Sequence, residues 1–297
     1  MAAHRHHGVV PICRTLQVAP SAVRSALARP VTALQLADEA LRPIIVELFE
    51  ANYRVYGRRK IKAALRREHG LVVDKDRIAR LMRELNIRGA TRSKTTITTR
   101  PDRSSPRAPD LVNRRFHATR PNQLWVSDFT YVATWSGFVF TAFVIDVHSR
   151  TIVGWRTAAS MTTALVMDAL EMAVFSRRLQ LINGVIAHSD AGSQYVSVAY
   201  TERLAEIGAR PSIGSIGDSY DNSLAESLNG LYKTELIRRQ GPWRNVEHVE
   251  LATLGWVEWF NNRRLHSELG DIPPAEFEHN YYARTRTETT VQTPTRT

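Results

Sequence analysis

Leu124-Trp125-Val126-Ser127-Asp128-Phe129-Thr130-Tyr131-Val132 carries the apolar, aromatic and β-branched residues that are typical of a strand, and a single acid interrupts them. Strand-like runs at 138–147 and 151–156 follow after connections too short for a crossover, so the three strands must be antiparallel. Helical patterns at 161–177, 198–207 and 222–237 then alternate with short apolar strands at 185–187 and 211–213. This order predicts an α/β domain with a mixed sheet and flanking helices.

Three acids stand where a surface charge is a poor explanation. Asp128 interrupts the first strand, where an unpaired carboxylate is costly to bury. Asp190 follows the strand around 185–187, at its carboxyl end, where ligand crevices form in α/β sheets. Glu226 lies in the first turn of the helix that begins near Asn222. The alternative for Glu226 is purely structural, because Ser223-Leu224-Ala225-Glu226 also fits a capping box.

Together these acids favour a metal site. Mg²⁺ prefers oxygen ligands and usually takes a few carboxylates while keeping waters and substrate phosphates in its shell. Asp128, Asp190 and Glu226 could hold two such ions. Two metals about 4 Å apart would activate a water or a 3′-hydroxyl and stabilise the leaving oxygen in an in-line displacement at phosphorus.

The charge of the chain is unevenly distributed. Forty Lys and Arg against 29 Asp and Glu give a net charge of +11. Residues 1–118 hold 24 basic and 10 acidic side chains, a net of +14, whereas residues 119–297 hold 16 and 19, a net of −3. Because the neutralisation of phosphates by Arg and Lys dominates nucleic-acid affinity, the first segment predicts DNA binding.

Three short helical patterns in this segment have the size of a helix-turn-helix module. They run over 34–52, over 58–67 with Gly70 as the end, and onward from Asp74 as a cap. A weaker pattern within 12–23 breaks and restarts with Ser21 as a possible N-cap, as in a partial helix-turn-helix. The alternative for the basic faces is a solvated surface. The expected DNA contacts are Arg58, Arg59, Lys60, Lys75, Arg77 and Arg80.

The expected organisation has five parts. They are an N-terminal segment at 1–33, a helix-turn-helix domain at 34–88, a basic linker at 89–118, a catalytic core at 119–282 and a disordered tail at 283–297. A single cysteine, Cys13, excludes an internal disulfide and favours a reducing compartment. No apolar run approaches the roughly 18 residues of a membrane span, so we expect a cytoplasmic protein with no membrane partner.

The spacing of the acids matches a known signature. Asp128 and Asp190 are 62 positions apart, and 35 residues separate Asp190 from Glu226. The chain resembles the OrfB-type transposases of insertion-sequence family three in this spacing and in four motifs. The motifs are Trp125-Val126-Ser127-Asp128, His188-Ser189-Asp190-Ala191-Gly192-Ser193-Gln194-Tyr195, Tyr220-Asp221-Asn222-Ser223-Leu224-Ala225-Glu226 and Trp259-Phe260-Asn261-Asn262-Arg263-Arg264. These are DDE transposases of the retroviral-integrase catalytic core superfamily. The resemblance runs from about residue 40 to residue 282.

The resemblance implies an RNase H-like fold with a mixed five-stranded sheet, two catalytic Mg²⁺ ions with Mn²⁺ as a substitute, and cleavage and joining of DNA ends. It carries the catalytic and metal-binding roles to Asp128, Asp190 and Glu226, and a DNA-binding role to Lys233. Residues 226, 229 and 233 share one helix face, so Asn229 is a further expected DNA contact. His188 and His266 stay open between DNA contact and a structural hydrogen bond.

The partners implied are the element's DNA ends and a target DNA, a homo-oligomer assembled on DNA, and an OrfA product of an upstream reading frame as fusion or partner. The expected location is the nucleoid in a bacterial cytoplasm. Two alternatives stay open: a catalytically silent DNA-binding regulator of transposition, and an RNase H-like nuclease that cuts without joining.

Overall fold

The computed structural model describes residues 9–91, 110–112, 116–177, 182–190, 192–214 and 223–291. The chain forms two compact units, Met1–Glu47 and Leu48–Thr297, and each is described by itself. Much of the basic linker expected at 89–118 falls outside the described residues.

The first unit is helical. It holds α1 (Val9–Thr15), α2 (Pro20–Leu27) and most of α3 (Ala33–Ala51), which runs on into the second unit. The expected N-cap at Ser21 is wrong, because the cap position is Ala19 and it makes no side-chain hydrogen bond. Pro20 begins the helix instead, since its missing N–H is not needed at the first helical position.

The second unit opens with two basic helices, α4 (Arg58–His69) and α5 (Lys75–Glu84). The expected end and start signals are confirmed. Gly70 adopts a left-handed conformation that closes α4, and the Asp74 carboxylate accepts a hydrogen bond from the Asp76 N–H at 2.8 Å to cap α5. The buried Ile61 and Leu65 of α4 and Ile78 of α5 form the apolar faces of this pair.

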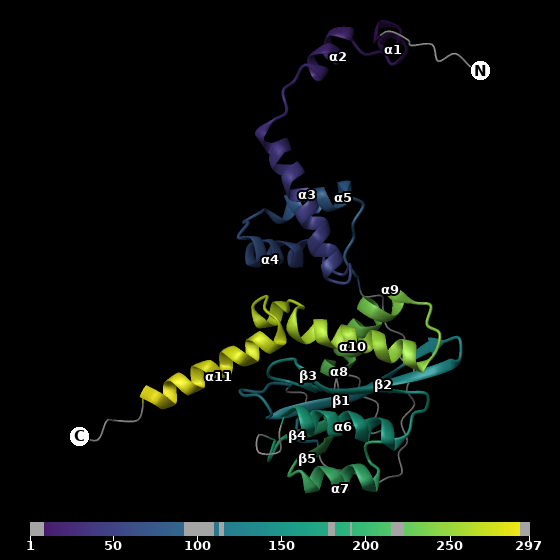
Figure 1. Cartoon of the computed structure of the whole chain (residues 1–297), viewed down its shortest axis with the longest axis vertical. Coiled ribbons are helices and arrows are strands. Elements are labelled where there is room, and N and C mark those ends of the chain that lie inside the picture. Colours follow the sequence, from purple (N-terminus) through teal and green to yellow (C-terminus); the bar gives the residue numbers. More distant parts are fainter. Residues whose placement is uncertain are drawn as a thin grey trace. The chain divides into compact units, whose positions relative to one another are not determined.

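A mixed five-stranded sheet follows, in the order β3-β2-β1-β4-β5 (Figure 1). The expected antiparallel meander consists of β1 (Leu124–Thr134), β2 (Gly137–Asp146) and β3 (Ile152–Ala158). β4 (Ile186–Ser189) pairs in parallel with β1, and β5 (Arg210–Ile213) pairs in parallel with β4. The mixed sheet is therefore confirmed, with β1 at its centre.

Helices cover both faces of the sheet. α6 (Thr163–Arg177) and α7 (Val198–Glu206) lie on one face, and α8 (Ser223–Tyr232) and α10 (Val246–Asn262) lie on the other (Figure 1). A side chain at Gly154 of β3 would place its Cβ only 2.0 Å from the Ala169 carbonyl oxygen of α6. This close approach seats α6 against β3, over a core that includes Trp125, Val144 and Leu170.

α8 does not end at Tyr232. It continues without a break through a π-helical turn (Lys233–Ile237) into α9 (Arg238–Gln240). After α10, a 3-10 turn (Ser267–Leu269) leads to α11 (Pro274–Val291). The disordered tail expected from 283 is therefore wrong as far as Val291, because the helix continues and the Thr285 and Thr287 hydroxyls donate to carbonyls four residues earlier.

Within the second unit, the segment that precedes α4 packs on α10 and the loop after it. The Tyr56 hydroxyl accepts a hydrogen bond from the Leu265 N–H at 2.8 Å. The Trp259 indole donates to the Asn52 side-chain oxygen at 3.1 Å. Arg67 of α4 forms an ion pair with Glu276 of α11. No helix in the described part of the chain is long and apolar enough to cross a membrane.

Candidate active site

Two of the three candidate acids are neighbours on adjacent strands. The parallel ladder pairs Ser127 of β1 with Ser189 of β4. Asp128 and Asp190 are the next residues after this pair, so they lie at the same level of the sheet. Paired strands lie about 4.8 Å apart. The topology therefore brings together two carboxylates that are 62 positions apart in the sequence.

Asp128 is held from both sides. Its Oδ1 accepts a hydrogen bond from the Phe129 N–H at 2.8 Å, and its Oδ2 accepts one from the Asn229 side-chain amide of α8 at 2.9 Å. Burial raises the pKa of Asp128 well above its ordinary value, and the negative charges of Asp190 and Glu226 raise this pKa further. Asp190 and Glu226 therefore both lie close enough to Asp128 for their charges to act on its carboxylate.

Asp190 sits in a tight turn. Its carboxylate accepts a hydrogen bond from the Gly192 N–H at 3.1 Å, and a Cβ at Gly192 would come within 3.0 Å of that same carboxylate oxygen. A glycine at this position lets the backbone approach the acid closely. Burial raises the pKa of Asp190, while the Gly192 hydrogen bond and the charge of His188 oppose the rise.

Glu226 lies in the first turn of α8, one helical turn before Asn229. Its side chain is exposed, and it makes no hydrogen bond or ion pair with another described residue. The capping-box bonds between Ser223 and Glu226 are thus not seen in the described part of the chain. Because Asn229 contacts Asp128 and residues three apart share a helix face, Glu226 faces the same region.

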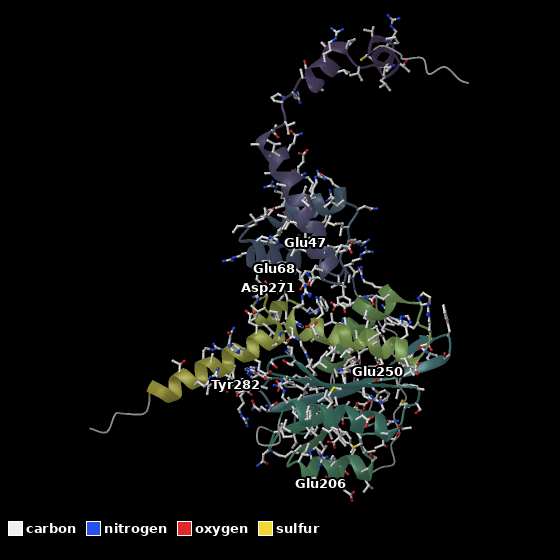
Figure 2. All side chains as sticks on the ribbon, viewed as in Figure 1. Glu47, Glu68, Glu206, Glu250, Asp271 and Tyr282 are labelled. Atoms are coloured by element: carbon white, nitrogen blue, oxygen red, sulfur yellow. The ribbon has the colours of Figure 1, made fainter. Side chains whose placement is uncertain are left out.

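Several acids elsewhere in this unit form ion pairs with arginines. Glu206 at the end of α7 pairs with Arg203 at 2.9 Å, and Glu250 of α10 pairs with Arg156 at 3.1 Å (Figure 2). Among the described residues, neither Asp190 nor Glu226 forms such an ion pair. Asp190 and Glu226 therefore lack an arginine partner among the described residues, which favours a bound cation as their counter-charge.

The donor set fits a hard divalent cation. It offers carboxylate oxygens from three elements, and two buried polar atoms beside them, Asn229 Oδ1 and the Tyr195 hydroxyl, have no hydrogen-bond partner among the described residues. No three acid, His or Cys side chains in the described ranges are gathered closely enough to enclose an ion. Mg²⁺ is usually held by one or two carboxylates and completes its shell with waters and substrate phosphates.

Lys233 lies beside the acids. Its ammonium nitrogen is 4.4 Å from the centre of the Tyr131 ring on β1, within cation–π range. Burial lowers the pKa of Lys233, the charge of Arg238 lowers it further, and the charge of Asp128 opposes this. Asn229, expected to contact DNA, donates its side-chain amide to Asp128.

The expected DNA contacts of α4 and α5 separate into two groups. Arg58, Arg59 and Lys75 are exposed, and Arg77 and Arg80 are half-buried. Arg58 pairs with Asp76 at 3.2 Å and Arg80 pairs with Glu84 at 2.9 Å, both weak surface contacts that a phosphate can replace.

Lys60 is partly buried, unlike the exposed Arg58 and Arg59 on the same helix. Its ammonium lies 5.1 Å from the Tyr56 ring centre, and burial, then the charge of Arg264, lower its pKa to about 7. The interior ion pair of Arg264 with both carboxylate oxygens of Glu235, at 2.9 and 2.6 Å, lies close to it. Lys60 thus faces the interior because α4 packs on this part of the unit.

Both histidines that were left open have structural contacts. His188 is buried on β4 and its Nδ1 is 2.9 Å from the Ser212 hydroxyl of β5. Burial, with the charges of Arg264 and Lys60, lowers the pKa of His266 to about 2, so its ring is neutral and packs edge-on against Phe260.

Tyr195 belongs to the motif around Asp190, and no functional role was predicted for it from the sequence. The Tyr195 ring is buried, stacks on Phe129, and lies close enough to Asp128 and Asp190 for their charges to raise the pKa of its hydroxyl after burial has done so. Its spacing of five from Asp190 was the available signal.

Comparison with known proteins agrees with this geometry. Residues 118–219 and 207–274 match two models described as an integrase core domain, and residues 35–95 match an HTH-like domain. The chain is 49% identical over 289 residues to the transposase for insertion sequence element IS629 of Shigella sonnei, with 93% of each chain covered. It is 48% identical over 272 residues to a protein of insertion sequence element IS986/IS6110 of Mycobacterium tuberculosis, covering 91% of this chain and 98% of the relative.

Among solved structures, the chain is similar to the simian T-cell lymphotropic virus intasome, with 16% identity, a TM-score of 0.47, and coverage of 73% of this chain and 70% of the other. An integrase core domain implies dependence on a divalent metal ion. Two relatives nearly half identical over almost the whole length, together with the integrase core and HTH-like matches, establish the family. The chain belongs to the DDE transposases of insertion-sequence family three.

Proposed function

We propose that Asp128, Asp190 and Glu226 are the catalytic acids with which this transposase cleaves the ends of its element and joins them to a target DNA. The observation that carries the proposal is the position of Asp128. It is a partly buried acid on the central strand, next to Asp190 and hydrogen-bonded to the helix of Glu226, and burial and the charges of these two acids raise its pKa.

The three acids would hold Mg²⁺, as two ions, with Mn²⁺ as a substitute. Such ions supply charge stabilisation at phosphorus during an in-line displacement. Asn229 fixes the rotamer of Asp128 through its amide, and the Phe129 N–H fixes the other oxygen. The Tyr195 ring stacks on Phe129, the residue after Asp128, and would bring its hydroxyl close to Asp128 and Asp190. Lys233, restrained by Tyr131, would contact a DNA phosphate beside the acids.

DNA capture would begin in the basic segment. Arg58, Arg59, Lys75, Arg77 and Arg80 on α4 and α5 would bind duplex DNA, in a domain at 34–88 joined by the basic linker to a core at 119–282. Because two element ends and a target must be held together, we propose a homo-oligomer on DNA, and an OrfA product of an upstream frame as partner or fusion. The substrate places the protein on the bacterial nucleoid.

The test is a plasmid assay with purified protein, a divalent metal and DNA carrying the terminal sequences that flank the gene. Asp190→Asn and Glu226→Gln should each abolish cleavage and joining while DNA binding stays within about twofold, because the amides are near-isosteric but poor ligands for Mg²⁺. The matched control is Asp168→Asn, an exposed acid of α6 that pairs with Arg156 at 3.3 Å. It should retain full activity.

The same assay separates the two alternatives. A catalytically silent regulator would bind the DNA ends without cutting them even as wild type. A nuclease that does not join would release 3′-hydroxyl ends that never appear covalently linked to the target plasmid. Loss of binding equal to the loss of cleavage in Glu226→Gln would assign Glu226 to the helix start rather than to the chemistry.

A further inference from the structure

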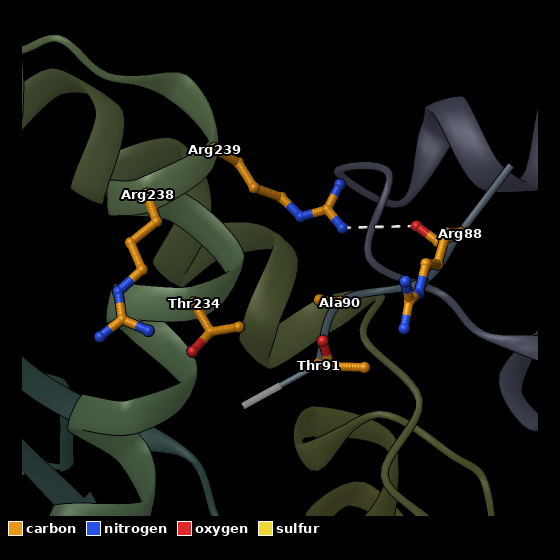
Figure 3. Close-up of a pocket in the computed structure, with 7 residues that line it drawn as sticks. Arg88, Ala90, Thr91, Thr234, Arg238 and Arg239 are labelled. Atoms are coloured by element: carbon orange, nitrogen blue, oxygen red, sulfur yellow. Dashed lines mark hydrogen bonds between the residues drawn. The ribbon is translucent and has the colours of Figure 1, made fainter. Parts of the chain in front are cut away.

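A cavity of about 350 Å³ lies where the chain leaves the helix-turn-helix helices and passes the far end of the catalytic helix (Figure 3). Its wall from the chain after α5 consists of Arg88, Gly89, Ala90 and Thr91, and its wall from the catalytic helix consists of Thr234, Arg238 and Arg239. We name these seven residues the arginine pocket. Both walls belong to the same compact unit.

The lining of the arginine pocket selects for an anion. It carries three guanidinium groups and two hydroxyls, and no acid is among its lining residues. Small-molecule sites are mostly apolar with few polar groups, so this lining disfavours such a ligand. Guanidinium groups match the geometry of phosphate with two parallel N–H donors. All three arginines are exposed, and therefore accessible to a large polyanion.

The fold fixes the backbone of the pocket's first wall. The Ala90 N–H donates to the Val55 carbonyl at 2.9 Å, which fixes the first wall to the start of α4. A Cβ at Gly89 would lie 2.6 Å from the Gly57 backbone, so these two segments are in direct backbone contact. The Arg239 guanidinium donates to the Arg88 carbonyl at 3.5 Å and spans the two walls (Figure 3).

One helix connects the pocket to the candidate active site and carries the basic residues Lys233 and Arg238 between them. Glu226, Asn229, Lys233 and Arg238 lie on one uninterrupted helix, and Arg238 is close enough to Lys233 to lower the pKa of its ammonium group. At about 1.5 Å of rise per residue, the pocket lies roughly 18 Å along the helix from Glu226. Successive phosphates of one strand advance about 3.4 Å each, so the separation corresponds to about five nucleotides.

We propose that the arginine pocket binds the phosphodiester backbone of the duplex DNA about five nucleotides from the phosphate that is cut, with Arg238 and Arg239 as its principal contacts. This inference rests on the proposed function for the identity of the cut phosphate, whereas the binding of DNA at the pocket can be measured without it. The pocket thereby links the DNA held by α4 and α5 to the DNA held at the acids.

The decisive experiment uses the full chain and a short duplex DNA of arbitrary sequence, because phosphate contacts do not depend on sequence. Removing two phosphate contacts by Arg238→Ala with Arg239→Ala should make the slope of log K against log salt shallower by about 1.8. The same relation predicts a loss of about 60-fold in affinity near 0.1 M salt that fades toward about 1 M. Circular dichroism and a thermal midpoint matching wild type would exclude a folding defect.

The matched control is Arg210→Ala, an exposed arginine on β5 at the far edge of the sheet. It should leave the slope and the affinity within experimental error of the wild type. An unchanged slope in the double variant, or an equal loss in Arg210→Ala, would overturn the proposal. Equal competition by inorganic phosphate at the pocket, with no effect of the double variant on DNA, would assign it to a small anion and overturn it too.

A second measurement locates the contact. The chain has one cysteine, Cys13, so a Cys13→Ser background can receive Thr234→Cys inside the pocket or Arg210→Cys outside it. Duplex DNA with thiol tethers on its backbone should form a disulfide with Thr234→Cys and not with Arg210→Cys. If Thr234→Cys forms no disulfide with the DNA while cleavage is intact, the proposed DNA contact at the pocket is refuted and the proposed function is not. If Asp190→Asn still cleaves DNA, the proposed function is refuted and the contact at the pocket is not.

Discussion

Replacing Lys60 by Met should stabilise the protein below about pH 7, because Lys60 is a partly buried amine whose charged form is disfavoured in the folded protein. Its ammonium group lies against the Tyr56 ring, and the charges of Arg264, Glu235 and Asp271 surround it. Burial, followed by the repulsion from Arg264, lowers the pKa of Lys60 from 10.5 to about 7. The folded protein therefore holds this proton more weakly than the unfolded chain does.

The size of the effect follows from this shift. Each pKa unit corresponds to about 1.36 kcal/mol, so the difference between 10.5 and about 7 sets an upper bound of about 5 kcal/mol on the cost of the buried charge. Loss of the cation–π contact with Tyr56 offsets about 1 to 2 kcal/mol of the gain. We expect the free energy of unfolding of Lys60→Met to exceed that of wild type by about 2 to 4 kcal/mol at about pH 6.

The gain should disappear as the pH rises. Between about pH 7 and about pH 10.5 the unfolded state binds more protons at Lys60 than the folded state does, so wild-type stability increases with pH over this range. The advantage of Lys60→Met shrinks by the same amount. The measurement is urea unfolding of both proteins at several values between about pH 6 and about pH 9.5, compared as a difference so that other titrating groups cancel.

Lys62→Met is the control, since Lys62 is exposed two positions further along α4. It should change the unfolding free energy by no more than about 0.5 kcal/mol at any pH. A destabilised Lys60→Met at about pH 6, or a difference that does not vary with pH, would refute the reasoning. So would a loss of DNA affinity greater in Lys60→Met than in Lys62→Met, because Lys60 would then reach phosphate.

Three further outcomes are expected. Asp128→Asn should raise the thermal midpoint in metal-free buffer, because it removes a partly buried carboxylate that the neighbouring acids repel. The variant should also lose the stabilisation by Mg²⁺, which is about 2.7 kcal/mol for an ion at a hundredfold its Kd. Equal shifts of the thermal midpoint with Mg²⁺ in both proteins, measured by scanning fluorimetry, would contradict this. Glu235→Gln should lower the free energy of unfolding in urea by about 3 to 5 kcal/mol, because it leaves Arg264 buried without its partner. The double variant Glu235→Leu with Arg264→Met should recover most of that loss. A single variant as stable as the wild type would contradict this prediction. Gly154→Ala should cost at least about 1 to 3 kcal/mol because its Cβ would meet the Ala169 carbonyl, and an unchanged unfolding midpoint would show that α6 can move away.

The sequence predicts helix ends and strand connections correctly where the signal acts over a few residues. Gly70 ends α4 and Asp74 caps α5 because a left-handed residue and an N-cap carboxylate act on backbone groups one or two positions away. The connection lengths between 124 and 156 excluded a crossover, which fixed the antiparallel meander. The local signals that failed were Ser21, where Pro20 begins the helix instead, and the tail, where α11 continues to Val291.

The site was predicted in its residue types more than in its contacts. Asp128 stood out because an acid is unfavourable in a central strand, and Asp190 because it follows one. Asn229 was placed on the correct helix face, but only the packing of α8 on β1 shows that its amide holds Asp128. Arg238 and Arg239 gave no signal beyond two adjacent arginines.

The chemistry available to this protein can be predicted from its amino-acid sequence: three acids at the spacing of the DDE transposases, a basic segment of +14, and the order of strands and helices. Which of these groups meet depends on the tertiary structure. The parallel pairing of β1 with β4 puts Asp128 beside Asp190, and the packing of α4 turns Lys60 inward while Arg58 and Arg59 stay exposed. The reason is physical: propensity and spacing act within a few residues, whereas burial, charge repulsion and pKa depend on atoms that folding brings from distant parts of the chain.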